Sequence, residues 1–175
     1  GIICTGPMLL GVVLQLGILL LCGWVGAQRD QQDLLVCMIT YTLLFSLMVN
    51  SIFALPVTRY IADRIFEGRD SYVLPAFMGS NFLLLIIGGV LYALLLCFSH
   101  TDLFAVMLMM LFLVELIVNW NAMSFLSAVK DYKAILIAFL YSVGISLLLA
   151  AVLMVFHRVS VTTMLMAITC GYGVM

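Results

Sequence analysis

The stretch SNFLLLIIGGVLYALLLCF, residues 80–98, decides the fold class because it contains no charged residue. An α-helix needs about 20 mainly apolar residues to cross the hydrocarbon core of a bilayer. A strand of a membrane β-barrel would instead alternate apolar and polar residues over about ten positions, and this stretch does not alternate. A helix also satisfies every backbone N–H and C=O group internally, as hydrocarbon requires. The stretch therefore predicts a transmembrane helix.

The composition extends this prediction to the whole chain. Of its 175 residues, 66% are hydrophobic and only 9% are charged, whereas soluble domains are usually about 25% charged. A water-soluble fold could not cover its core with so few ionic side chains. The net charge of −1 creates no field that attracts nucleic acid. We therefore predict an all-α integral membrane protein whose residues 1–175 form a single transmembrane lobe.

Short polar breaks divide the chain into apolar runs. The breaks are RDQQD (29–33), a charged segment (59–70), SHTD (99–102), KDYK (130–133) and HRVS (157–160). They predict six transmembrane helices, near residues 2–26, 35–60, 77–98, 103–129, 134–156 and 160–175. Both ends of the sequence lie in apolar runs, so we expect a piece of a longer membrane protein.

The lysines and arginines predict the orientation, because they gather in the cytoplasmic loops of membrane proteins. The second and fourth breaks contain five of these residues, and the other three breaks contain two. We therefore expect the charged segment and KDYK to lie in the cytoplasm, with the first helix running outward.

The charged segment concentrates ionic side chains in a chain that otherwise has few. Arg59, Asp63 and Glu67 are spaced i, i+4 and i+8, so a continuing helix would place them on one face. Such pairs contribute about 0.2–0.5 kcal/mol each in water. We expect the second helix to continue past the bilayer surface and to end at Gly68, which suits a C-terminal cap.

Two roles are open for the charged segment. It can be a basic helix end that fixes the topology of the protein. It can also be a cytoplasmic gate or a docking surface for a partner, because it contains more charge than topology requires. The residues of this second hypothesis are Arg59, Asp63, Arg64, Glu67 and Arg69.

Prolines and small residues predict how the helices bend and pack. Pro56 is expected to kink the second helix, because it removes a backbone donor. Pro75 suits the first turn of the third helix. Ser142, Ser146 and Ala150 repeat at four-residue spacing, which predicts a stripe where a neighbouring helix approaches closely.

Three stretches resemble a known family: Gly6–Pro7, RYIADRIFEGRDSYVLPAF (59–77) and NW…FLSAVKDYKAIL (119–136). They are similar to the PelG family of Pel exopolysaccharide transporters, in the multidrug/oligosaccharidyl-lipid/polysaccharide exporter superfamily. The resemblance implies about twelve transmembrane helices in two six-helix lobes around a central cavity. This chain would be most of the first lobe.

The resemblance also implies a function. It implies a multi-pass flippase or exporter of the bacterial inner (plasma) membrane that moves Pel-type glycan polymer from the cytoplasm outward for the biofilm matrix. The expected partners are the polysaccharide substrate, the other synthase and export subunits, the lipid bilayer and the second lobe of the same chain. Two alternatives stay open: an ion-coupled small-solute or drug exporter of the same architecture, and a non-transporting membrane scaffold for a polysaccharide synthase.

Glu115 is the only charged residue in the interior of a predicted transmembrane helix, since Arg59 lies at the end of the span 35–60. An ionised and unpaired carboxylate there costs at least about 2.5–3.5 kcal/mol, so we expect it to face the bundle interior or a cavity. Asn119 lies one turn further on and shares this face. Three roles are open for Glu115: a protonated, hydrogen-bonded structural acid, a contact to sugar hydroxyl groups, or binding of a coupling proton or sodium ion.

Two further residues complete the hypothetical substrate path or ion-coupling site. Trp120 can pack between helices or stack on a sugar ring. Asn50 can bond to a neighbouring helix, or share a face with Arg59 towards a cavity. These two residues join Glu115 and Asn119 in the predicted set.

The sequence shows no sign of an enzyme. It lacks HExxH, GxSxG, the P-loop and GxGxxG, and its five cysteines have no metal-ligand spacing. We therefore expect no catalytic residue, no cofactor and no metal site.

Overall fold

The computed structural model describes residues 12, 16–17, 19–20, 29–68, 70–98, 102–129, 132–155 and 160–174, and these form helices with short turns at their ends. The elements are α2 (Arg29–Phe66), the short 3-10 helix η1 (Asp70–Tyr72), α3 (Val73–Cys97), α4 (Leu103–Val129), α5 (Tyr132–Val155) and α6 (Val161–Gly173). The predicted all-α class is confirmed for these residues. Most of the predicted first span, 2–26, lies outside them.

Four of the described helices are long and apolar enough to cross a membrane. They occupy the predicted second to fifth spans and are α2, α3, α4 and α5. The apolar helix α6 has only 13 residues, which is shorter than the hydrocarbon core requires. The chain is therefore a multi-pass membrane protein, and the number of spans beyond these four stays a prediction.

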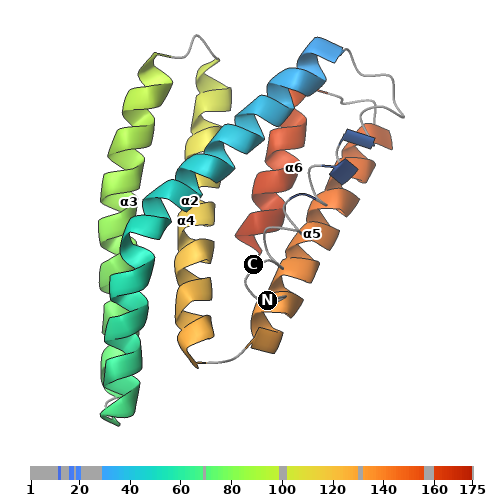
Figure 1. Ribbon diagram of the computed structural model, residues 1–175. Helices are drawn as coiled ribbons and strands as arrows, with labels where there is room; N and C mark the ends of the chain where they lie inside the picture. Colours follow the sequence, from blue (N-terminus) through green and yellow to red (C-terminus); the bar gives the residue numbers. More distant parts are fainter. Residues whose placement is uncertain are drawn as a thin grey trace.

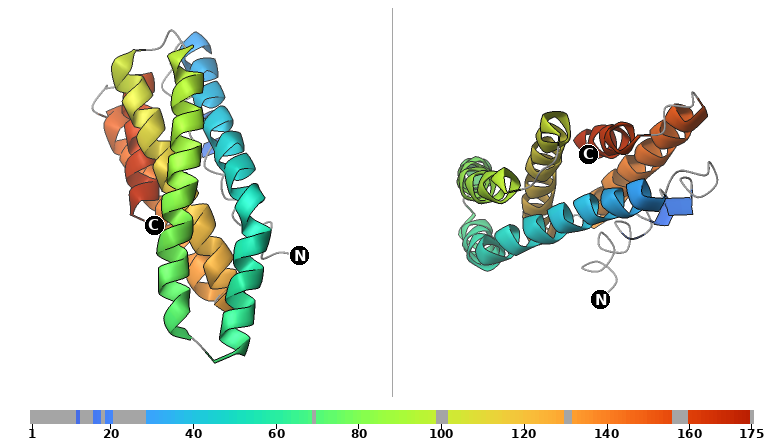
Figure 2. Two further views of the ribbon diagram at one scale, coloured as in Figure 1. Left: turned by 90° about the vertical axis from the view of Figure 1, so that its left-hand side faces the viewer. Right: turned by 90° about the horizontal axis from the view of Figure 1, so that it is seen from above.

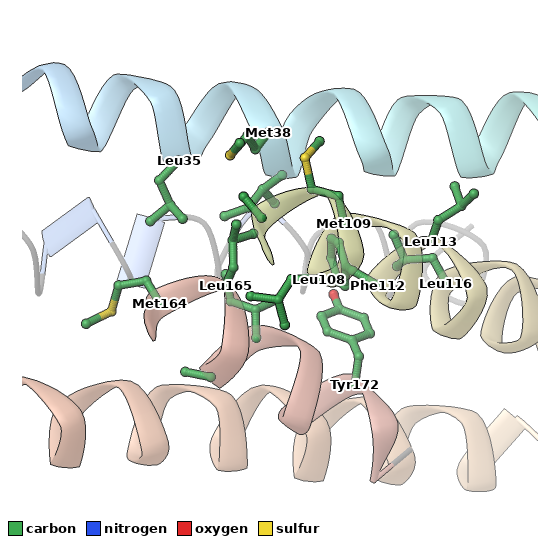
Figure 3. Close-up of a cluster of buried hydrophobic side chains, with 14 of the residues drawn as sticks. Leu35, Met38, Leu108, Met109, Phe112, Leu113, Leu116, Met164, Leu165 and Tyr172 are labelled. Carbon is green, nitrogen blue, oxygen red and sulfur yellow. The ribbon is translucent and has the colours of Figure 1, made fainter. Parts of the chain in front are cut away.

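Helix α4 is the centre of the bundle, since it contacts α2, α3, α5 and α6. Seen from above, α3, α4, α6 and α5 form a row, and α2 runs along one side of it (Figure 2). The close-up shows one cluster to which α2 contributes Leu35 and Met38, α4 contributes Phe112, and α6 contributes Leu165 and Tyr172 (Figure 3). A side chain on α4 can therefore face any of its neighbours.

The helix α2 extends beyond the predicted span 35–60 at both ends, and the extension at its N-terminal end was not predicted. Its 38 residues correspond to about 57 Å at 1.5 Å per residue, against about 30 Å for the hydrocarbon core. The break RDQQD is not a loop, because α2 begins at Arg29. The negative charge of Asp30 in the first turn stabilises the helix by interacting with the positive end of its dipole. The predicted extension beyond residue 60 is confirmed.

The end of α2 follows the predicted chemistry. The last helical residue is Phe66, and Gly68 has a φ of 69° and donates its N–H to the carbonyl of Ile65 at 3.0 Å. A left-handed φ of this kind is easy for glycine alone. The chain then turns through η1 into α3, where Pro75 lies in the first turn as expected.

Pro56 lies inside α2, and Figure 1 shows that the axis of this helix changes direction along its length. A proline ring has no N–H for the carbonyl four residues earlier and clashes with it. The helix therefore changes direction, as predicted, and it contains a proline that can cause such a change.

Helices α5 and α6 approach each other closely at small residues. Ser142, Ser146 and Ala150 are all fully buried, which confirms the predicted stripe. A Cβ atom added at Gly171 would lie 2.9 Å from the Cα atom of Ser146. The two backbones could not approach this closely if Gly171 carried a side chain.

We expect Gly171→Ala to destabilise the full-length protein in detergent by about 1–3 kcal/mol, because overpacking forces the backbones of α5 and α6 apart. Thermal unfolding of the purified protein measures this effect. Gly144→Ala on α5 is the matched control, since a Cβ there meets nothing within 4 Å and alanine is the better helix former. Equal stability of the two variants would contradict this account of the α5–α6 contact.

Candidate functional site

Glu115 lies in the middle of α4 and faces α6. Its Oε1 atom sits so close to Gly173 that a Cβ there would lie 2.9 Å from it. Its Oε2 atom is buried and has no hydrogen-bond partner. Asn119, one turn further along α4, donates from Nδ2 to the carbonyl of Tyr172 at 3.4 Å. The predicted shared face of Glu115 and Asn119 is confirmed, and it is the face towards α6.

An apolar contact borders this site. The rings of Phe112 and Tyr172 meet edge-to-face with centroids 5.5 Å apart, and Figure 3 shows them between α4 and α6. Phe112 is fully buried. Glu115 therefore lies between this apolar contact and the amide of Asn119.

The electrostatic environment of Glu115 disfavours an isolated negative charge. Glu115 is the only charged residue of α4, and α6 has none. An ionised carboxylate without a partner at this depth costs several kcal/mol, while a neutral carboxylic acid has one O–H to donate. The site can hold a proton, or it can accept a hydrogen bond or a cation from a ligand.

Trp120 belongs to a different set of contacts. Its Nε1 donates to Ser46 Oγ on α2 at 3.2 Å, and its ring lies 6.4 Å from the ring of Phe139 on α5. The donor of the indole is thus used between helices. Of the two open roles for Trp120, these contacts favour packing.

The predicted shared face of Asn50 and Arg59 is wrong. Asn50 is 8% exposed, whereas the side chain of Arg59 is exposed. Nine residues turn a helix by about 900°, which places the two side chains on opposite faces. Asn50 instead shares the face of Thr42 and Ser46, spaced by four residues along α2.

That face of α2 is part of a polar seam, which is the set of interhelical hydrogen bonds among α2, α3 and α4. Thr42 Oγ1 bonds to the Tyr92 hydroxyl at 2.6 Å, and Asn121 Nδ2 donates to Ser80 Oγ at 2.8 Å. Sequence reasoning missed these pairs. The four-residue spacing of Thr42, Ser46 and Asn50 was the signal that could have revealed one side of the seam.

The charged segment lies at the end of the hairpin formed by α2 and α3. Arg64 pairs with Glu67 at 2.8 Å, as the predicted helix allows. The guanidinium carbon of Arg64 lies 5.1 Å from the ring centroid of Tyr60 and 5.6 Å from that of Tyr72. Arg59 and Asp63 are exposed, and Arg69 lies outside the described residues. Two aromatic rings and one carboxylate therefore hold Arg64 in place.

The hairpin end projects from the bundle. Figures 1 and 2 show the ends of α2 and α3 reaching beyond the adjacent ends of α4 and α5. Phe66 at this end is 93% exposed, and Leu74 is 65% exposed. Charged and apolar side chains are thus presented together.

Two apolar grooves lie elsewhere on the surface. One has a volume of about 560 Å³ and runs along α5 beside Tyr141 and Gly144. The other has a volume of about 460 Å³ and lies between Tyr41, Tyr92 and Met109. Neither groove includes Glu115 or the hairpin end, so both are separate from the candidate site.

Comparison with known proteins gives one match. The family model described as "PelG: Putative exopolysaccharide Exporter (EPS-E)" matches residues 1–175. No curated protein and no solved structure matches the chain. The match covers every residue and confirms the resemblance found in the sequence.

We expect the Thr42–Tyr92 contact to stabilise the full-length protein by about 0.6 kcal/mol, and by no more than about 1.7 kcal/mol, as for other interhelical hydrogen bonds in membranes. A double-mutant cycle of Thr42→Val and Tyr92→Phe, followed by unfolding in detergent, measures this coupling free energy. Thr42→Val combined with Ser51→Ala is the control, because Ser51 bonds within its own helix to the carbonyl of Met48. A coupling of zero for the first pair would remove Thr42–Tyr92 from the polar seam.

Proposed function

Since the chain belongs to the PelG family of exopolysaccharide exporters, we propose that it is one lobe of a bacterial inner-membrane exporter that moves glycan polymer from the cytoplasm outward. The family match over residues 1–175 is the observation that carries this proposal. The four long apolar helices support a multi-pass protein in the membrane. A polysaccharide is the substrate class that the family implies, and the family is described as one of exporters.

The α4–α6 face is the part of this lobe that we assign to the substrate path. Glu115 has a buried oxygen without a partner, and Asn119 makes a long contact to Tyr172. A carboxylate and an amide together can accept and donate hydrogen bonds to sugar hydroxyl groups. Trp120 and Asn50 then serve the path indirectly, by holding α4 and α2 together.

The projecting hairpin is the part that we assign to the cytoplasmic synthase or another export subunit. Large exposed apolar side chains beside charges are typical of interaction sites, and Phe66 and Leu74 are of this kind. Arg64 is already ordered by Tyr60, Tyr72 and Glu67, so binding through it loses less conformational entropy. Transport would then follow alternating access of two lobes, with this hairpin as the entrance.

One observation favours a second function. A single acid deep in a membrane protein is a common site for a coupling ion, so an ion-coupled exporter of small solutes or drugs remains the alternative use of the same architecture. Polymer export that persists without an ion gradient would argue against it. A non-transporting scaffold would require the hairpin but not Glu115.

We expect Glu115→Ala to lower polymer export by the full-length protein about tenfold or more, because one hydrogen bond to a charged group is worth about 1.5–3 kcal/mol. Glu115→Gln should also lower export, since it keeps the shape of the side chain but cannot ionise. Secreted polymer per cell, normalised to the amount of protein in the membrane, measures the effect. Asp102→Asn is the control, because Asp102 is an exposed acid before the start of α4. Unchanged export in Glu115→Gln would rule out both the ion-coupling role and the carboxylate contact.

We expect the double variant Arg59→Glu/Arg64→Glu to weaken co-purification of the synthase by about tenfold, which corresponds to about 1.4 kcal/mol. The reason is that reversal of both charges also breaks the Arg64–Glu67 pair. Lys133→Glu is the matched control, because it reverses an exposed charge at the start of α5 on the side assigned to the cytoplasm. Full recovery of the synthase with the double variant would remove the hairpin as its docking surface.

A further inference from the structure

Gly173 provides the space in which the Glu115 carboxylate lies. A Cβ at Gly173 would be 2.9 Å from Oε1 and 3.5 Å from Cδ of Glu115. The carboxylate therefore rests on the backbone of α6 and not on a side chain. Its other oxygen, Oε2, is buried without a partner. Burial in this position costs much less free energy for a neutral carboxylic acid than for a charged carboxylate.

The helices on either side of this contact are joined in different ways. Hydrogen bonds between side chains connect α2, α3 and α4, as in Thr42–Tyr92, Ser46–Trp120 and Ser80–Asn121. Close backbone packing at Ser146 and Gly171 connects α5 and α6. Each group is thus held by contacts within itself.

The contact between the group α2, α3 and α4 and the group α5 and α6 contains weaker hydrogen bonds. Across α4 and α6, the described residues show the ring contact of Phe112 and Tyr172 and the long bond from Asn119 to Tyr172. Glu115 lies at the same place. The α4–α6 contact is therefore where a change of one charge would alter the relative position of the two groups most directly.

We propose that Glu115 is a protonation-dependent latch that closes α4 against α6 at Gly173. A neutral Glu115 rests against the α6 backbone. Loss of its proton leaves a charge whose Oε2 has no donor there, so the carboxylate leaves and α4 separates from α6. The proposal adds a conformational role to the same site and rests on the proposed function only for its use in transport.

Among the described residues, no other charged side chain lies beside Glu115 that would obscure a pH response of this contact. The titratable side chain beside it on α6 is that of Tyr172, and α3 has no charged residue. The charged residues of α2 lie near its two ends, in Arg29–Asp33 and at residues 59–64, and Lys133 lies at the start of α5. Glu115 is thus the acid whose proton is exchanged at the contact.

The test measures the separation of α4 and α6 in the full-length protein in lipid nanodiscs. One spin label is attached to Cys170, which is exposed on α6, and one to Leu111→Cys, whose native side chain is 51% exposed on α4. Both positions are about one turn from the latch. The other cysteines are replaced by serine, and the distance distribution is recorded by pulsed electron paramagnetic resonance from acid to alkaline pH.

In the spin-labelled parent protein, we expect the distance between the two labels to increase as the pH rises. Glu115→Gln, which stays neutral, should keep the short distance throughout. Gly173→Ala should show the longer distance even at acid pH, because its Cβ displaces the carboxylate. Gly89→Ala is the matched control and should behave like the parent protein, since a Cβ there meets nothing within 4 Å.

Distance distributions of the parent and Glu115→Gln that coincide at every pH would overturn the latch. The same holds if Gly173→Ala and Gly89→Ala cannot be distinguished. The measurement requires no glycan, so it separates the two proposals. If the distance does not depend on pH, the latch is wrong, but the proposed export function is unaffected. If the protein does not export polymer, a pH-dependent distance still supports the latch.

Discussion

Lipid tails are as apolar as leucine, so the hydrophobic effect does not drive transmembrane helices together. This constraint applies to every contact between helices in the bundle. Helices in lipid associate through close packing and through hydrogen bonds between polar side chains. Both appear here, in separate places. The backbones of α5 and α6 meet at Ser146 and Gly171, whereas α2, α3 and α4 are joined by Thr42–Tyr92, Ser46–Trp120 and Ser80–Asn121. The apolar side chains fill the space that these contacts leave.

The central position of α4 explains why the candidate site lies on it. This helix touches all the other long helices, and its faces differ in chemistry. Trp120 and Asn121 are engaged with α2 and α3. Glu115 and Asn119 face α6, where the Glu115 carboxylate lies against Gly173 and retains an oxygen without a partner. Among the described residues of α4, the unused bonding capacity therefore lies on the α6 side.

The sequence predicted what depends on a single helix and missed what depends on which helices are neighbours. Spacing and local chemistry were enough to predict the helix positions, the cap at Gly68, the common face of Glu115 and Asn119, and the stripe that begins at Ser142. The start of α2 at Arg29 was missed because charge alone does not end a helix. The partner of Trp120 could not be predicted, because apolar runs do not specify their order in the bundle. Asn50 and Arg59 were paired wrongly, although helical geometry alone already separates them.

The length of α2 has a mechanical consequence. One continuous rod of 38 residues runs from its contact with α6 to the projecting end at Phe66. A helix is stiff along its axis, so α2 can transmit a force from one of its ends to the other. Whatever binds the hairpin end also pulls on the part of α2 that contacts α6, without any intervening loop to absorb the movement.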